Sequence, residues 1–282
     1  MVDTPSHNGR SPRGKPAPPR LSTPNAATRE RIHGIWDKLA DFDAAQVDGA
    51  LTFLLHSLCA LVGAQNADWF GVVRLPDSLP GDPVHGWRPP VVHYLHPTEK
   101  LLATVKDQTR KLEQGIANDI VVRMVEMSGG FRACRLCDIA PAGWFDSAFY
   151  REYYLDCGHE DAIYIAFPVN EDAESYFGLF RATGQPPFSP AERNAAAYAL
   201  RGIKWFHRQI LLSHGLLIAE KGLTPVERRV LKNLLTGLAE KQIAAELGQT
   251  HNTTHEYVSA IYRKFGVGNR AALMALWLGR EP

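Results

Sequence analysis

Cysteine and long apolar runs are scarce in this sequence, and each scarcity excludes a class of protein. Four cysteines in 282 residues are too few for a disulfide-held scaffold, so we expect a reducing, cytoplasmic compartment. No run of about 18 uncharged apolar residues is present to predict a membrane-spanning helix. Residues 1–24 lack the apolar core of a secretory signal. The length suggests about two globular domains.

Motifs of the common enzyme classes are also missing. The sequence has no glycine-rich phosphate loop, no GxSxG motif and no HExxH motif, so we predict that the chain is not an enzyme and needs no cofactor. Cys134 and Cys137 form a single CxxC pair, whereas a structural zinc ion takes four ligands. Cys157 and His159 could complete such a set, and redox sensing is a further alternative. We expect ordinary thiols and no metal site.

The net charge of +1 hides an uneven distribution. Residues 1–31 carry six basic and two acidic side chains, residues 32–218 carry 16 and 22, and residues 219–282 carry nine and six. A basic terminal module favours a polyanionic partner. Residues 1–27 are rich in proline and arginine and poor in large apolar side chains, which predicts a disordered tail.

Residues 28–215 alternate between helical and strand patterns. We expect helices near 32–42, 47–62, 98–124 and 146–155, and strands near 68–75, 91–95, 131–139, 162–169 and 176–182. Ser189, Pro190 and Glu192 form a capped helix start, and the pattern continues to about residue 218. That helix would span about 40 Å at 1.5 Å per residue. The order predicts an α+β domain with one mostly antiparallel sheet.

The last 60 residues predict four short helices. Thr224 and Glu227 form a second capping box, a helix over 240–247 ends at Gly248, and Thr250 caps a helix over 251–265. Two helices joined by a short glycine-containing turn are typical of the helix-turn-helix motif, whose second helix enters the major groove of DNA. On that helix, apolar positions repeat on one face and polar side chains occupy the other.

The motifs of this segment resemble the LuxR-type DNA-binding domain. They include Leu223-Thr224-Pro225-x-Glu227, Gly237-Leu238-x-x-Lys241-x-Ile243-Ala244 and Ile261-Tyr262-Arg263-Lys264-Phe265-Gly266-Val267-x-Asn269-Arg270, and the match spans Gly222 to Leu278 without gaps. The resemblance implies a four-helix domain, here residues 216–282, that acts as a dimer in transcription control. The DNA-contact residues predicted from the polar face and the resemblance are Lys241, Thr250, Asn252, Thr253, His255, Glu256, Ser259, Arg263 and Lys264.

Several positions depart from the pattern of this family. Thr254 stands where valine is usual, and its hydroxyl could bond back to the carbonyl of residue 250. His255 stands where lysine is usual, which removes a fixed positive charge near a phosphate. Ala239 replaces the serine that normally caps the first helix of the motif. We therefore hypothesise weaker non-specific DNA binding than is usual and an unusual operator.

The end of the middle domain resembles GAF-like sensor domains. The resemblance rests on Ile163–Val169, the turn before Tyr176-Phe177-Gly178-Leu179-Phe180, and the Ser189 helix start. It implies a small-molecule pocket between the sheet and its covering helices. The candidates for this pocket are Trp69, Phe70, Tyr94, Trp144, Phe149, Tyr150, Tyr153, Asp161, Tyr164 and Tyr176. Each aromatic could instead fill the core, and Asp161 could cap a turn.

Three alternatives to a GAF-like sensor concern the role of residues 28–215. An acyl-homoserine-lactone-binding domain has a similar pattern of spaced aromatic and acidic residues, but the Asp-Pro of that family is absent because Ala162 follows Asp161. A phosphoacceptor receiver would begin with alternating strands and helices, which this chain does not. A third alternative is a domain that only dimerises.

The favoured interpretation is a homodimeric transcription regulator that binds double-stranded DNA, with RNA polymerase and a small-molecule effector as further partners and no membrane.

Overall fold

The computed structural model describes residues 17–75, 80–217 and 222–280. Its centre is a sheet of β1 (Asn66–Arg74), β2 (Trp87–Tyr94), β3 (Arg132–Arg135), β4 (His159–Pro168) and β5 (Ala173–Ala182). The strands lie in the order β2-β1-β5-β4-β3, and every neighbouring pair is antiparallel. This confirms the predicted α+β class.

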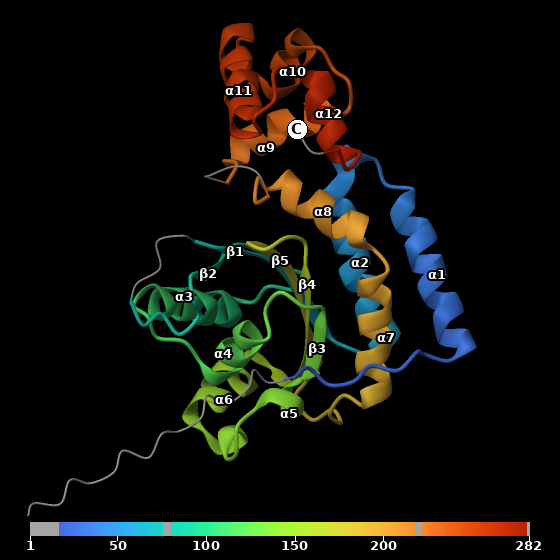
Figure 1. The fold of residues 1–282 in the computed structure, drawn as a ribbon, viewed down its shortest axis with the longest axis vertical. Coiled ribbons are helices and arrows are strands. Elements are labelled where there is room, and N and C mark those ends of the chain that lie inside the picture. Colours follow the sequence, from blue (N-terminus) through green and yellow to red (C-terminus); the bar gives the residue numbers. More distant parts are fainter. Residues whose placement is uncertain (1–16, 76–79, 218–221, 281–282) are drawn as a thin grey trace, which may run out of the picture.

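One face of the sheet packs against α2 (Val47–Val62), α7 (Pro190–Arg201) and α8 (Lys204–Ser213), with α1 (Ala26–Ala40) outside them (Figure 1). The apolar stripe of α2 is completely buried at Leu51, Leu54, Leu55 and Leu58, as the helical spacing of these residues requires. Residues 44–62 are apolar enough by length and composition to cross a membrane. In this fold α2 is the central helix of the core of the α+β domain.

The other face is covered by α3 (Glu99–Glu113), α4 (Asp119–Glu126) and α6 (Ala148–Tyr153) (Figure 1). The single helix expected over 98–124 is two helices, because α3 ends before Gly115, whose φ is +78°, and Asn118 caps α4. The strand expected over 131–139 ends at Arg135, and Leu136–Ile139 form the short helix α5. Three-residue 3₁₀ helices cover Ala44–Gln46, Trp144–Asp146 and Leu155–Cys157.

The long helix expected from Ser189 to about residue 218 is interrupted after Arg201. Gly202 lies against the indole ring of Trp36, and α8 begins only at Lys204. The break leaves the carbonyl of Leu200 without its usual partner, and His207 Nε2 donates to it at 2.8 Å. Because a carbonyl oxygen can only accept, Nε2 carries the proton of the neutral imidazole. Nδ1 is then an acceptor, and the Ser175 hydroxyl donates to it at 2.9 Å. These bonds anchor the break to β5.

The first helix begins inside the predicted tail. Asn25 caps α1 by accepting from the Thr28 amide at 2.9 Å. Before it, the carbonyl of Arg20 accepts from Arg193 of α7 at 3.0 Å, and Ser22 accepts from Asn194. Residues 17–27 are therefore fixed to the α+β domain, which corrects the predicted boundary at residue 28. The first 16 residues of that predicted tail lie outside the described residues.

The C-terminal unit consists of α9 (Pro225–Leu235), α10 (Glu240–Leu247), α11 (His251–Lys264) and α12 (Arg270–Trp277). Its core is a separate apolar cluster that includes Val230, Leu234, Val258, Ile261 and Trp277. The predicted capping box of α9 is present, with Thr224 N–H donating to Glu227 at 2.7 Å. The four predicted helices and their starts are confirmed.

Candidate DNA-binding face and ligand cavity

A tight turn sets α11 against α10. Gly248 ends α10 with a φ of +63°, a conformation that glycine adopts without a steric penalty. Two residues later the Thr250 hydroxyl accepts from the Thr253 amide at 3.1 Å and caps α11. Thr254, Val258 and Ile261 are buried toward α9 and α10. The opposite face of α11 is therefore turned outward.

The outward face of α11 carries most of the predicted DNA-contact residues. Lys241 on α10 is exposed, as are five residues of α11, which are Asn252, His255, Glu256, Ser259 and Arg263. Thr253 is half-buried, and its hydroxyl shares a 2.8 Å hydrogen bond with Thr250. His255 Nδ1 lies 2.9 Å from a carboxylate oxygen of Glu240. These groups could meet base edges and phosphates.

Two of the predicted DNA-contact residues, Lys264 and Thr250, also have partners within the protein. The Lys264 ammonium donates to Glu227 at 2.7 Å and to the carbonyl of Gly222 at 3.2 Å, so it joins α11 to the start of α9. Thr250 serves as the cap of α11. Thr254 is completely buried, and its hydroxyl donates to the Gln249 side chain at 3.2 Å rather than to the backbone carbonyl of residue 250.

A cavity of about 390 Å³ lies between the second face of the sheet and α3, α4 and α6. This volume is within the range of small-molecule sites. Most of its lining is apolar or aromatic, with Val72, Leu112, Ile120 and Met124 among the contributors. Five of the ten pocket candidates line it, which are Phe70, Phe149, Tyr153, Tyr164 and Tyr176.

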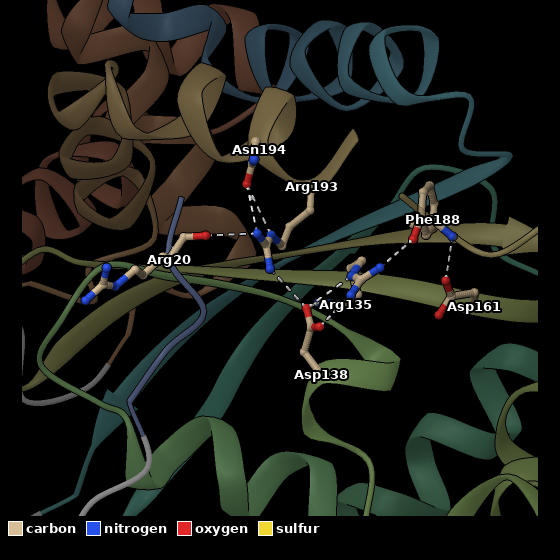
Figure 2. A network of polar contacts seen from close by, with 7 residues as sticks. All are labelled: Arg20, Arg135, Asp138, Asp161, Phe188, Arg193 and Asn194. Atoms are coloured by element: carbon tan, nitrogen blue, oxygen red, sulfur yellow. Dashed lines mark hydrogen bonds and ion pairs between the residues drawn. The ribbon is translucent and has the colours of Figure 1, made fainter. Parts of the chain in front are cut away.

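The other five candidates lie elsewhere. Trp69 points to the opposite face of the sheet, because neighbours on a strand alternate, and its indole donates to Ser175 at 2.8 Å. Trp144 and Tyr150 pack on each other with ring centroids 5.1 Å apart. Tyr94 lies on β2 beside the lining. Asp161 accepts from the Phe188 amide at 2.7 Å (Figure 2), so it caps the turn before α7, the alternative left open for it.

Figure 2 shows the polar network that surrounds this turn. Asp138 of α5 pairs with Arg135 at 2.7 Å and with Arg193 at 3.2 Å. Burial raises the pKa of Asp138, but hydrogen bonds from Arg135 and the charge of Arg193 lower it below its usual value. The network holds β3 and the N-terminal segment to α7, outside the cavity.

The cavity also has polar lining that the sequence did not single out. Lys111 and Tyr153 lie at its wall and both bond to Asp107. His159 is buried and stacks on Phe180 at a centroid distance of 4.4 Å, and burial lowers its pKa to about 4. Asp68 of β1 also lines the cavity. Asp68, Phe70 and Val72 are alternate residues of one strand. This period of two was the sequence signal that could have placed Asp68 on the same face as Phe70.

The two cysteines of the CxxC pair lie in different surroundings. Cys134 is buried on β3, where burial raises the pKa of its thiol to about 12, whereas Cys137 is exposed on α5. Within the described part of the chain, no group of three or more His, Cys, Asp or Glu side chains is placed to hold a metal ion. Cys157 and His159 therefore do not complete a set with this pair.

The fold and these two sites define a two-part protein, an α+β domain with a cavity between its sheet and helices, followed by a helix-turn-helix domain. Residues 221–277 match the model of "Bacterial regulatory proteins, luxR family". This C-terminal segment is therefore a LuxR-family helix-turn-helix domain. It is 39% identical over 57 residues to the probable HTH-type transcriptional regulator GfsR of Streptomyces halstedii, covering 20% of this chain and 24% of that protein.

Solved structures similar to this chain include two of SdiA and one of a VqsR domain. SdiA in complex with octanoyl-rac-glycerol gives a TM-score of 0.46 at 14% identity, covering 89% of this chain and 94% of that one. Escherichia coli SdiA in the space group P6522 gives a TM-score of 0.43 at 12% identity, covering 90% of this chain and 97% of that one. The VqsR LBD domain from Pseudomonas aeruginosa gives 0.42 at 14% identity, with 67% and 98% covered.

Proposed function

We propose that this chain is a cytoplasmic, sequence-specific DNA-binding transcription regulator, not an enzyme, and that it acts as a homodimer. The observation that carries the proposal is the outward polar face of α11, held by the Thr250 cap within a segment that matches the LuxR family. In a helix-turn-helix domain this helix lies in the major groove. A two-fold dimer would read half-sites about one helical turn apart.

Within this proposal the exposed residues have different roles. Arg263 and Lys241 are positioned to neutralise phosphates, which gives affinity without sequence preference. Asn252 and Ser259 can hydrogen-bond to base edges. Glu256, as an acceptor, can discriminate in favour of a cytosine amino group. The imidazole of His255 lies against the carboxylate of Glu240, which fits the hypothesis of weaker non-specific DNA binding.

The DNA-binding part of the proposal is tested by salt dependence. The full chain should bind a 30-base-pair duplex of arbitrary sequence, with an affinity that falls as salt rises. The slope of log K against log salt should decrease by about 1 in Arg263→Ala and in Lys241→Ala. Absence of binding at 50 mM salt would overturn the proposal.

We further propose that the α+β domain binds a small molecule that alters DNA binding. The cavity of about 390 Å³ supports this over a domain that only dimerises, since a domain with no ligand has no need of an apolar cavity between its sheet and helices. A ligand would act by favouring one of two dimer arrangements. Native mass spectrometry of the full chain should find a dimer with extra mass that is lost on denaturation. A dimer without extra mass, which also fails to bind an apolar probe, would favour constitutive dimerisation.

A further inference from the structure

An aligned row of residues crosses the floor of the cavity. Strand pairing places Tyr94 of β2 opposite Asp68 of β1, Asp68 opposite Gly178 of β5, and Gly178 opposite Tyr164 of β4. Residues directly opposite one another in antiparallel strands project from the same face of a sheet. The row therefore places a carboxyl group between two phenol groups, and Asp68 and Tyr164 both line the cavity.

Gly178 makes room for the carboxyl group of Asp68. A Cβ atom at this position would lie 2.4 Å from Asp68 Oδ1, too close for any side chain. Instead the Gly178 amide donates to Oδ1 at 3.0 Å. Asp68 is only 4% exposed, and within the described part of the chain no cation or donor reaches its second oxygen, Oδ2. One oxygen of a buried carboxyl group thus faces an apolar cavity without a protein partner, which is costly unless a ligand or water supplies one.

The surroundings of Asp68 determine its protonation. Burial raises the pKa of its carboxyl group well above the usual value, and the Gly178 amide opposes this only in part. The neutral form is therefore favoured, with Oδ1 accepting from Gly178 and Oδ2 carrying the proton. Nearby, the hydroxyls of Tyr154 and Tyr164 share one hydrogen bond of 2.7 Å. One of those two protons remains free to donate.

We propose that the ligand of this cavity is an uncharged, largely apolar molecule whose carbonyl oxygen accepts a hydrogen bond from Asp68 Oδ2. The free hydroxyl of the Tyr154–Tyr164 pair can donate a second one. The inference rests on the ligand-binding function proposed above and adds the class of ligand. An amine would instead require the ionised carboxylate, and the cost of charging this buried group works against it.

The experiment uses the full chain and a neutral fluorescent probe, N-phenyl-1-naphthylamine, which reports occupation of the apolar cavity. Decanamide and decylamine, which share a ten-carbon chain, are then compared as displacing ligands. Decanamide should displace the probe at least tenfold more effectively than decylamine at pH 7. Its affinity should fall at least tenfold in Asp68→Leu, and should stay within threefold in Asp68→Asn, because the Asn amide can donate in place of Oδ2.

Two controls separate binding chemistry from folding. Asp161→Asn changes another buried aspartate of the sheet, one that lies outside the cavity, and should leave decanamide binding unchanged. Asp68→Asn preserves shape, so its result is informative even where Asp68→Leu fails to fold. In the unmodified chain, decanamide affinity should weaken as the pH rises and Asp68 ionises, and this dependence should be absent in Asp68→Asn.

Different results overturn different claims. Stronger displacement by decylamine, abolished in Asp68→Asn, would mean that Asp68 is an ionised acceptor, and would overturn the carbonyl assignment. Equal displacement by decanamide from the unmodified chain and from both Asp68 variants would remove Asp68 from the ligand site while leaving the cavity function intact. Failure of the probe itself to bind the unmodified chain would overturn the ligand-binding function and this inference with it.

Discussion

Asp48 of α2 accepts a hydrogen bond of 2.8 Å from Arg228 of α9, and this pair joins the α+β domain to the helix-turn-helix domain. Lys232 reaches the other oxygen of Asp48 at 2.5 Å, and Arg228 also donates to the carbonyl of Ser213 at the end of α8. The first helix of the DNA-binding domain is thus held by two helices of the cavity domain. A shift of those helices would be transmitted to α9 directly.

Removing the Asp48 charge should loosen this junction. Burial raises the pKa of Asp48, but the hydrogen bond from Lys232 and the charge of Arg228 outweigh it and hold the pKa below its usual value. A depressed carboxyl pKa contributes stability at neutral pH that is lost as the pH falls from about 4 through the folded-state pKa. We expect Asp48→Asn to cost about 0.5–1 kcal/mol and to speed amide hydrogen exchange in α9 at pH 7. Asp41→Asn, which breaks an exposed pair with Lys38, is the control and should leave α9 unchanged.

Lys264 and Arg263 are neighbours on α11 with different expected roles. Because Lys264 pairs with the nearly buried Glu227, Lys264→Met should lower the free energy of unfolding by about 1–2 kcal/mol and leave the salt dependence of DNA binding unchanged. Arg263→Ala should reduce that salt slope by about 1 with little effect on stability. Urea unfolding and fluorescence anisotropy at four salt concentrations distinguish the two. A reduced salt slope in Lys264→Met would restore it as a phosphate contact.

His255 offers a gain-of-charge test. His255→Lys introduces a fixed positive charge at a position exposed on α11, where the partner Glu240 can neutralise only part of it. We expect a steeper salt dependence and tighter binding to a duplex of arbitrary sequence. Identical slopes for the variant and the unmodified chain would contradict the hypothesis that this histidine weakens non-specific binding.

Three buried histidines predict a loss of stability in acid. Burial lowers the pKa of His207 and of His159 to about 4, and that of His214 to about 3. In the unfolded chain these groups titrate near 6.5, so the unfolded state binds more protons below that pH. Stability is therefore full above pH 6.5 and falls toward pH 4, by up to about 1.4 kcal/mol per pH unit for each histidine. Urea unfolding between pH 4.5 and 7.5 measures this slope, and His207→Gln should reduce it.

Gly202 tests the packing that breaks the long helix. Its backbone is in an ordinary helical conformation, but a Cβ atom would lie 2.3 Å from Cζ2 of Trp36. Because an indole ring cannot yield by bending, Gly202→Ala should destabilise the chain by about 1–3 kcal/mol. Gly34 lies within α1 with no atom in the way, so Gly34→Ala should be neutral or stabilising by up to about 1 kcal/mol. Thermal unfolding compares the two, and a Gly202→Ala chain as stable as Gly34→Ala would contradict the account.

The sequence predicted the elements that depend on local signals. The capping boxes at Ser189 and Thr224 have both partners in place, and the C-terminal helices begin and end where their caps indicate. Gly202 was not recognised as a break, because the periodicity of the helix continues across it and only the distant Trp36 explains the interruption.

The candidate sites were predictable to different degrees. The DNA-binding face followed from periodicity on one helix, and most of its residues are exposed as expected. Lys264 lies on the same helix, but its partner Glu227 comes from α9, and pairing between helices is not visible in the spacing. The cavity depends on which face of a strand each residue occupies. Adjacent Trp69 and Phe70 were both proposed, whereas alternation allows only one, and Asp68 shares the face of Phe70.

The most direct test of the account is selection of binding sites by the full chain from a library of random duplexes. We predict enrichment of a two-fold symmetric sequence with half-sites about one helical turn apart. Asn252→Ala should relax the preference at particular bases while non-specific affinity persists. Recovery of sequences indistinguishable from the starting library, by a chain that is folded and dimeric, would contradict the assignment of a sequence-specific regulator.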